Sequence, residues 1–248
     1  MEIITERIKT TEGVEAFLAR PKDQRVPAVL VHFEIFGVTG HIEDVCRRLA
    51  TEGYVALAPD YYWRLQKRTV PYSDVKGAFG LGLTLKDEQV FADVESCLQY
   101  LAAQSFVYPD AMATLGFCMG GRLSFLTATR DPRNISAAIS FYGGGLAGEN
   151  RRDGQTINPM EEAAKIRCPL LLFYGGLDQY ITAEHVDKFT DRLKQLGKGY
   201  QSYVYPGAGH GFFCNDRSSY HPEAAADAWQ KTLAFLETSV KGNLSAAH

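Results

Sequence analysis

The chain has 248 residues, of which 46% are hydrophobic and 22% charged, and its 26 basic and 29 acidic side chains give a formal net charge of -3. This is ordinary globular composition, and a chain this long should bury roughly 70 to 75% of its unfolded surface without disulfide or metal staples. The weak negative charge and the lack of long runs of like charge argue against nucleic acid as a partner.

The N-terminal segment and the cysteines indicate where the protein works. Charges are spaced throughout the first twenty residues, so no apolar leader is expected and we predict a cytoplasmic protein. The longest apolar runs, near 28–33 and 169–174, are too short for a membrane helix, so no membrane partner is expected. The cysteines are odd in number and scattered, which suits a reducing compartment; they are Cys46, Cys97, Cys118, Cys168 and Cys214.

Short apolar stretches alternate along the chain with segments of helical periodicity. Two edge strands are predicted first, and core strands and helices then alternate. The predicted strands are 3–9, 14–19, 27–33, 54–58, 111–115, 136–141, 170–174 and 201–205. The predicted helices are 41–52, 87–103, 119–129, 183–196 and 222–240, with Gly53 and Gly197 as C-terminal stops.

This alternation predicts an α/β fold with a mostly parallel sheet between helices on both faces, a three-layer αβα sandwich. We expect a single domain over residues 1–248, with 242–248 as a frayed tail. The stretches 61–85 and 143–159 lack clear periodicity and are predicted to be long loops near the strand ends. Ligands of such sheets usually bind there.

A glycine-rich turn carries the first candidate catalytic residue. The segment Gly-Phe-Cys-Met-Gly-Gly at 116–121 follows an apolar strand and precedes a helical pattern. Glycines two positions before and after Cys118 leave room beside it, as a nucleophile raised above a sheet requires. A lone cysteine in such a turn is more often structural, so the assignment depends on its partners.

An acid and a histidine follow two later strands. His210 lies in a glycine-rich segment after the last predicted strand, where a neutral imidazole could act as a general base. Asp178 follows the strand predicted at 170–174 and could hold that imidazole in one tautomer. The order of nucleophile, acid and histidine, each at the carboxyl end of a strand, matches an α/β-hydrolase triad. The pattern therefore favours an enzyme.

With these motifs the chain resembles the dienelactone hydrolase family, whose members carry a cysteine nucleophile on an α/β-hydrolase fold. The matching segments are GFCMGGR at 116–122, EIFG at 34–37, APDY at 58–61, YG at 142–143, GGLD at 175–178 and GHGF at 209–212. The resemblance implies hydrolysis of small esters or lactones, as by a carboxymethylenebutenolidase, through an acyl-enzyme thioester. It also implies that Glu34 lies beside the nucleophile and that the backbone N–H groups of Ile35 and Met119 form the oxyanion hole.

Two electrostatic effects should act on the Cys118 side chain. A helix N-terminus favours the thiolate by about 0.3 to 1 kcal/mol. A carboxylate at about 4 Å, with an effective dielectric of about 20, opposes it by about 4 kcal/mol. We therefore expect Glu34 to keep Cys118 a neutral thiol until substrate or His210 changes the proton arrangement, although Glu34 could instead be a solvated loop carboxylate.

The substrate is less defined than the catalytic residues. Dienelactone-cleaving members of the family bind the substrate carboxylate with arginines, one of them four residues after the histidine, where this chain has Cys214. Arg217 could take that role. A second positive charge could come from Arg64, Lys67 or Arg68. The departure leaves open whether dienelactone is a substrate.

Further residues near the predicted strand ends could line a binding site. Arg122, one helical turn after Cys118, more readily pairs with a surface acid than binds substrate. Aromatic side chains suggest a small planar or apolar substrate, although many could be core residues. The aromatic candidates are Phe36, Tyr61, Trp63, Tyr142, Phe212 and Phe213.

No cofactor or metal site is expected. Residues 143–148 match G-x-G-x-x-G, but the polar segment that follows cannot form the packed helix of a dinucleotide site. Two alternatives stay open: a broad carboxylesterase or thioesterase without a role in dienelactone breakdown, and a non-catalytic protein that binds ligands or senses redox state through Cys118. The expected partner is a small ester or lactone, and the protein should be a monomer or a weak homodimer.

Overall fold

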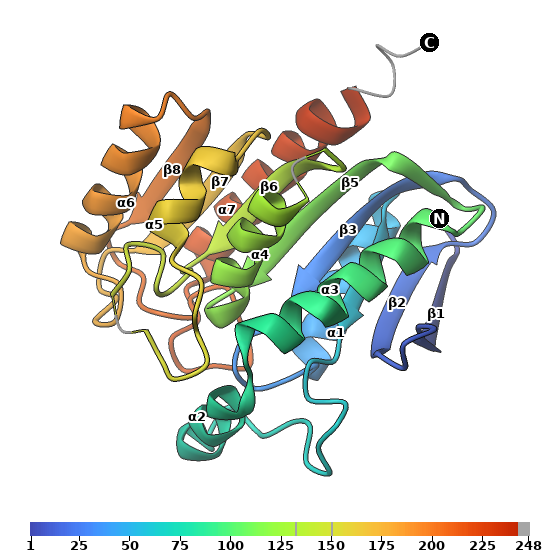
Figure 1. Ribbon diagram of the computed structural model, residues 1–248, viewed down its shortest axis with the longest axis horizontal. Coiled ribbons are helices and arrows are strands. Elements are labelled where there is room, and N and C mark those ends of the chain that lie inside the picture. Colours follow the sequence, from blue (N-terminus) through green and yellow to red (C-terminus); the bar gives the residue numbers. More distant parts are fainter. Residues whose placement is uncertain (132, 150, 243–248) are drawn as a thin grey trace.

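The computed structural model describes residues 1–131, 133–149 and 151–242. Its centre is one eight-stranded sheet with the strand order β1-β2-β4-β3-β5-β6-β7-β8 (Figure 1). The strands are β1 (Ile3–Lys9), β2 (Glu15–Pro21), β3 (Val26–His32), β4 (Val55–Pro59), β5 (Val107–Phe117), β6 (Ile135–Phe141), β7 (Leu170–Gly175) and β8 (Tyr200–Tyr205).

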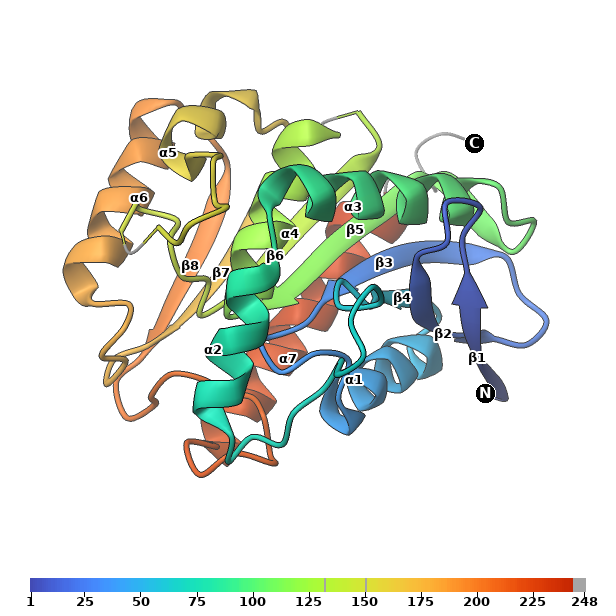
Figure 2. The same ribbon diagram turned by 60° about the horizontal axis from the view of Figure 1, so that its bottom comes forward.

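Helices cover both faces of this sheet (Figures 1 and 2). One face carries α1 and α7, and the other carries α3, α4 and α6, where Phe125 of α4 packs edge-on against Phe189 of α6. The helices are α1 (Gly40–Thr51), α2 (Val75–Thr84), α3 (Asp87–Ala102), α4 (Met119–Arg130), α5 (Pro159–Glu162), α6 (Ala183–Gln195) and α7 (Pro222–Leu236). The predicted α/β fold with a mostly parallel sheet is confirmed.

The direction of the strands determines where the functional loops gather. Strands β4, β3, β5, β6, β7 and β8 pair in parallel, whereas β2 pairs antiparallel with both β1 and β4. Of the two predicted edge strands, only β1 lies at the edge of the sheet. Strands β3, β4 and β7 are buried along their whole length, as expected of parallel strands covered on both faces. The segments that follow β3, β5, β7 and β8 therefore leave the sheet at the same edge.

The predicted strand boundaries are close to the observed ones, with one larger difference. Strand β5 begins at Val107, earlier than predicted, and Val107 pairs with Val26 of β3. Polar residues between Val107 and Ala111 interrupt the apolar pattern there. At Gly53 and Gly197 the backbone has φ of 82° and 63°, as expected of glycines that end helices.

The prediction that 61–85 is a loop was wrong in its second half, because α2 occupies Val75–Thr84. Three glycines hide this helix in the sequence, and Asp74 begins it by accepting a hydrogen bond from the Gly77 N–H at 2.8 Å. Its apolar residues Val75, Phe79 and Leu83 remain exposed. Helical periodicity was absent because α2 is not packed as an ordinary core helix.

The ends of two other segments also differ from expectation. The predicted loop at 143–159 overlaps α5 only at Pro159, and a 3-10 turn follows α5 at Ala163–Lys165. The last helix continues from α7 into a π-helical turn at Glu237–Lys241. Of the predicted frayed tail, residues 243–248 lie outside the described residues. Within the described residues, no helix combines the length and apolarity needed to cross a membrane.

Candidate active site

Cys118 stands on a strained turn between β5 and α4. Its backbone has φ 55° and ψ -117°, a conformation unusual for a residue with a side chain. The Cys118 N–H donates a 2.9 Å hydrogen bond to the Phe141 carbonyl of β6. A Cβ at Gly116 would lie 1.9 Å from the Gly120 carbonyl oxygen, and one at Gly120 would lie 2.3 Å from the His32 carbonyl oxygen. Both glycines are therefore needed for the turn.

Asp178 and His210 meet at the same edge of the sheet. The Asp178 side chain is fully buried, and its Oδ2 is 2.7 Å from His210 Nδ1. Its other oxygen accepts backbone hydrogen bonds from Tyr180 at 2.8 Å and Ile181 at 3.0 Å. Because these bonds fix the carboxylate, it can hold the imidazole with Nε2 free for proton transfer.

The protonation of His210 is coupled to Cys118. Burial by itself would lower the pKa of His210, but the charge of the nearby Cys118 sulfur and the hydrogen bond to Asp178 outweigh it and raise the pKa to about 10. The rings of Tyr142 and Tyr180 pack against the imidazole, with centroids at 5.1 and 5.4 Å. This arrangement stabilises the protonated form of the His210 imidazole beside the Cys118 sulfur.

The carboxylate of Glu34 is paired with an arginine, which the sequence did not predict. Its side chain is 1% exposed, and its Oε1 accepts a 2.7 Å hydrogen bond from Arg217 Nη1. The Arg217 guanidinium lies over the Phe36 ring at 5.5 Å, and a Cβ at Gly211 would lie 2.3 Å from it. Arg217 therefore offsets the negative charge that was expected to act on Cys118.

Two backbone N–H groups lie where an oxyanion could be bound. Ile35 follows Glu34 after β3, and in the part of the chain that the structure describes its N–H has no hydrogen-bond partner. The Tyr62 hydroxyl fixes this peptide by donating a 3.0 Å hydrogen bond to the Ile35 carbonyl. Met119 is the first residue of α4, so its N–H has no partner within the helix.

A cavity of about 390 Å³ brings these groups together. The predicted site residues on its wall are Ile35, Phe36, Cys118, Met119, His210 and Arg217. Other wall residues were not predicted: Val75 and Phe79 come from α2, Tyr180 follows β7, and Arg152 comes from the segment between β6 and α5. Val75, Phe79 and Arg152 lie in the two stretches expected near the binding site, but without periodicity in these stretches the individual residues could not be identified.

Several predicted substrate-binding residues do not line this cavity. Tyr61 is buried, 2.6 Å from His32 Nδ1. Trp63 and Arg64 both donate to Asp93, which α3 carries, so the charge of Arg64 is used in a structural ion pair. Their aromatic and basic character resembled a binding loop, but tertiary packing engages them elsewhere.

Tyr142 and Phe212 lie behind the site rather than on the wall of the cavity. Both rings are completely buried, and their centroids are 5.4 Å apart. Tyr142 contacts His210 and has a positive φ of 39°. These residues support the imidazole from the core. Phe213 is also buried, against Phe117.

The remaining basic candidates and Cys214 also have other partners. Lys67 pairs with Asp74 at 3.5 Å, and Arg68 pairs with Glu15 and Asp60. Cys214 is buried, and burial raises the pKa of its thiol to about 12. Among the described residues, no three His, Cys, Asp or Glu side chains gather as metal ligands would.

Comparison with known proteins identifies relatives over nearly the whole chain. The model of the dienelactone hydrolase family matches residues 14–240. A protein of Escherichia coli O157:H7 named "Putative carboxymethylenebutenolidase" is 37% identical over 91% of this chain and 83% of its own length. A protein of a Bradyrhizobium species named "Probable 2-oxo-3-(5-oxofuran-2-ylidene)propanoate lactonase" is 36% identical over 92% of this chain and 90% of its own length.

Solved structures show the same architecture. The crystal structure named "Putative Dienelactone Hydrolase" from Klebsiella pneumoniae superposes with a TM-score of 0.87 at 36% identity, covering 95% of this chain and 99% of its own. A dienelactone hydrolase-like promiscuous phosphotriesterase from metagenomic libraries, at 21% identity and a TM-score of 0.77, shares the fold and covers 97% of this chain and 100% of its own.

Proposed function

Because this chain belongs to the dienelactone hydrolase family, and so to a family of ester and lactone hydrolases, we propose that it uses Cys118 as a nucleophile and forms an acyl-enzyme thioester. One observation carries this proposal. The thiol of Cys118, on its strained turn, shares a cavity with His210, which Asp178 orients through a 2.7 Å hydrogen bond.

In the first step, with the proton of the Cys118 thiol held by His210, the sulfur attacks the carbonyl carbon of the ester or lactone. The N–H groups of Ile35 and Met119 donate to the oxygen that becomes negative. The tetrahedral intermediate then expels the alcohol oxygen, which receives the proton from His210. The carbonyl carbon is left bound to sulfur as a thioester.

In the second step, His210 takes a proton from water, and the resulting hydroxide attacks the thioester carbon. The carbon–sulfur bond breaks and the acid leaves. The proton then stays on His210 or returns to the Cys118 sulfur, which restores the starting state. In a lactone, the alcohol and the acid belong to one molecule, so the net reaction is ring opening by water.

Arg217 gives Glu34 a part in this scheme. The Arg217 guanidinium lies on the cavity wall and is the counter-ion of Glu34. An anionic substituent that reached Arg217 would compete with Glu34 for the guanidinium. The freed Glu34 carboxylate could then accept the thiol proton and pass it to His210. The lactone named for the Bradyrhizobium relative is a propanoate, which supports a substrate of this charge.

The test is hydrolysis of p-nitrophenyl acetate and of a dienelactone by the wild type, Cys118→Ala and His210→Ala. We expect both variants to fall to near background and the wild-type acyl-enzyme to be trapped by mass spectrometry on Cys118. Cys168→Ala, which removes a buried thiol two residues before β7, is the matched control and should keep its activity. Robust turnover by Cys118→Ala would end the assignment, and the ratio of kcat/KM values would rank esters against lactones.

A further inference from the structure

Arg152 places a positive charge on the cavity wall, with no carboxylate paired to it among the described residues. It lies on the cavity wall with Cys118 and Met119. Its Nη1 atom is fully buried, and in the described part of the chain it has no hydrogen-bond partner. The Arg152 side chain as a whole is partly exposed, but a buried donor atom without a partner is uncommon and calls for an explanation such as a ligand. None of the described residues forms an ion pair with Arg152.

Other arginines around the site are already neutralised. Arg64 pairs with Asp93 in a bidentate contact, Arg217 pairs with Glu34, and Arg122 pairs with Asp87. Arg152 therefore differs from its neighbours in having its positive charge available. An arginine remains charged in proteins, and its planar fork fits a carboxylate with two parallel hydrogen bonds.

Helix α2 leaves a space for the Arg152 side chain. A Cβ at Gly82 would lie 2.6 Å from Arg152 Nη1 and 3.3 Å from the side chain of Ile35. A Cβ at Gly80, two residues earlier in the same helix, would meet nothing within 4 Å. Gly82 therefore lets the guanidinium lie between α2 and Ile35, next to the expected oxyanion donor.

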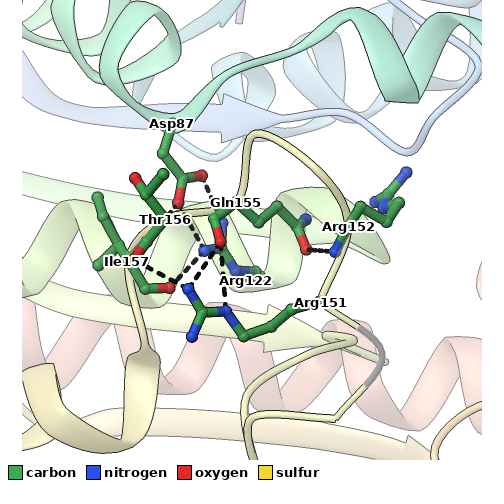
Figure 3. A network of polar contacts seen from close by, with 7 residues as sticks. All are labelled: Asp87, Arg122, Arg151, Arg152, Gln155, Thr156 and Ile157. Atoms are coloured by element: carbon green, nitrogen blue, oxygen red, sulfur yellow. Dashed lines mark hydrogen bonds and ion pairs between the residues drawn. The ribbon is translucent and has the colours of Figure 1, made fainter.

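A buried ion pair fixes the segment that carries Arg152 (Figure 3). Arg122 of α4 donates through both terminal nitrogens to Asp87, the first residue of α3, at 2.8 Å each. Arg122 also donates to the Ile157 carbonyl at 2.7 Å, and Asp87 accepts from the Ile157 N–H at 2.9 Å. Arg122 was expected to pair with a surface acid, but both partners are buried, 1% and 4% exposed.

Three further contacts shape the segment near Arg152. The Arg152 N–H donates to the Gln155 side chain at 3.0 Å, and Arg151 donates to the carbonyls of Gln155 and Thr156 (Figure 3). In Figure 3 the Arg152 guanidinium points away from this network, whereas that of Arg151 points into it. The two adjacent arginines thus have different roles, one in the segment and one in the cavity.

The acidic residue of this wall, Glu149, acts on other groups. Its Oε1 accepts a 2.7 Å hydrogen bond from the Gly145 N–H, and its charge adds to the burial that raises the pKa of Tyr174. The charge of Arg152 acts instead on Tyr62, where it opposes the rise in pKa that burial causes. The other oxygen of Glu149, Oε2, is buried without a hydrogen-bond partner, and among the described residues no ion pair joins Glu149 to Arg152.

We propose that Arg152 is a specificity residue that binds an anionic substituent, a carboxylate, on the ester or lactone, and that the Asp87–Arg122 pair positions it. The inference rests on the proposed hydrolase function and adds a residue to it. A neutral substrate of the same shape would leave the Arg152 charge unpaired, so selectivity for the anion follows from the geometry.

The test compares substrates that differ only in charge. Phenyl acetates with a carboxylate or a carboxamide at the meta or para position place the charge on the leaving group. Mono-4-nitrophenyl terephthalate and its amide place it on the acyl group. For Arg152→Gln we expect the anion-to-neutral ratio of kcat/KM to fall about 10-fold or more in at least one pair, since hydrogen bonds to charged groups are the strong ones. Arg167→Gln, which removes an exposed arginine elsewhere, should leave the ratio unchanged.

Gly82→Ala tests the same site without removing the charge. The new methyl group would displace the guanidinium, so the ratio should fall as in Arg152→Gln, while Gly80→Ala adds the same methyl group to α2 and should not change it. An indirect effect through Ile35 would lower turnover of both substrates in a pair equally. A fall in the anion-to-neutral ratio of kcat/KM is therefore specific to Arg152.

Binding without turnover separates this inference from the proposed function. Calorimetry should show that Cys118→Ala protein binds terephthalate at least several-fold more tightly than the Cys118→Ala, Arg152→Gln double variant does. If esters are hydrolysed but neither the ratios nor this affinity depend on Arg152, the inference is overturned and the hydrolase assignment stands. If nothing is hydrolysed but terephthalate binding depends on Arg152, the anion site stands and the hydrolase assignment falls.

Discussion

At the scale of single residues, the protonation of His210 depends on Cys118. Burial lowers the pKa of the imidazole, and the sulfur charge and Asp178 more than compensate, so that the pKa rises to about 10. The charge of the Cys118 sulfur therefore stabilises the protonated form of His210.

Replacing the sulfur should reveal this coupling directly. In Cys118→Ala, burial and the Asp178 hydrogen bond remain while the sulfur charge is gone, so we expect the pKa of His210 to fall well below its wild-type value. An NMR titration of the imidazole nitrogens measures it in both proteins, with Cys168→Ala as the control. An unchanged pKa in Cys118→Ala would show that Asp178 alone sets it.

The same shift makes a prediction about stability. Because the pKa of His210 is raised from 6.5 to about 10 on folding, its protonation stabilises the folded state fully below about pH 6.5, and this contribution is lost as the pH rises through 10. The free energy of unfolding of wild type relative to His210→Gln should therefore decrease between pH 7 and 10.5. Urea titrations at several pH values measure this, and a constant difference would contradict it.

At the scale of elements, the strand–turn–helix unit of β5 and α4 determines the orientation of Cys118. The turn is possible because two glycines let backbone atoms approach closely, from Gly116 to the Gly120 carbonyl and from Gly120 to the His32 carbonyl. The obstacles are backbone atoms, which cannot rotate away as a side chain can. The elbow thus ties β5 and α4 to the end of β3.

Gly120→Ala should therefore disrupt both folding stability and activity. The added methyl group would lie 2.3 Å from the His32 carbonyl oxygen. We expect the free energy of unfolding to fall by about 1 to 3 kcal/mol or more. We also expect turnover to fall at least as much as the fraction of folded protein does. Gly199→Ala, whose Cβ would meet nothing within 4 Å, is the control. Urea unfolding and ester hydrolysis measure the two effects, and an unaffected Gly120→Ala would refute the close approach.

At the scale of the whole molecule, one buried ion pair joins three segments that are distant in sequence. Asp87 and Arg122 are 35 residues apart, and Asp87 and Ile157 are 70 apart. Figure 3 shows the pair where α3, α4 and the segment between β6 and α5 meet. The cavity wall that carries Arg152 thus depends on contacts made far from Cys118 in the sequence.

Asp87→Ala should loosen the segment of the cavity wall that carries Arg152. It leaves the buried Arg122 charge without its partner, a change that typically costs about 3 to 5 kcal/mol, and frees the Ile157 N–H. We expect a lower urea midpoint, faster amide hydrogen exchange at residues 151–157, and a loss of the anion-to-neutral selectivity ascribed to Arg152. Asp110→Asn, which changes an exposed carboxylate, serves as the control. Unchanged exchange in the segment would mean that the pair does not hold it.

The sequence by itself determined the strand and helix alternation and the chain order of Cys118, Asp178 and His210. These features depend on local patterns: apolar runs, helical spacing, and the glycines around a tight turn. Parallel pairing then places the ends of β5, β7 and β8 at one edge, so the 2.7 Å contact between Asp178 and His210 follows from residues recognisable in the sequence.

Only the tertiary structure decided which charges face the cavity. Arg64, Arg122, Arg152 and Arg217 look alike in the sequence, but long-range pairing gives three of them a buried or nearly buried carboxylate. The fourth, Arg152, reaches the cavity through a space at Gly82, in a helix without recognisable periodicity. The physical reason is that the cost of burying a charge depends on partners brought together by folding, and no local pattern records them.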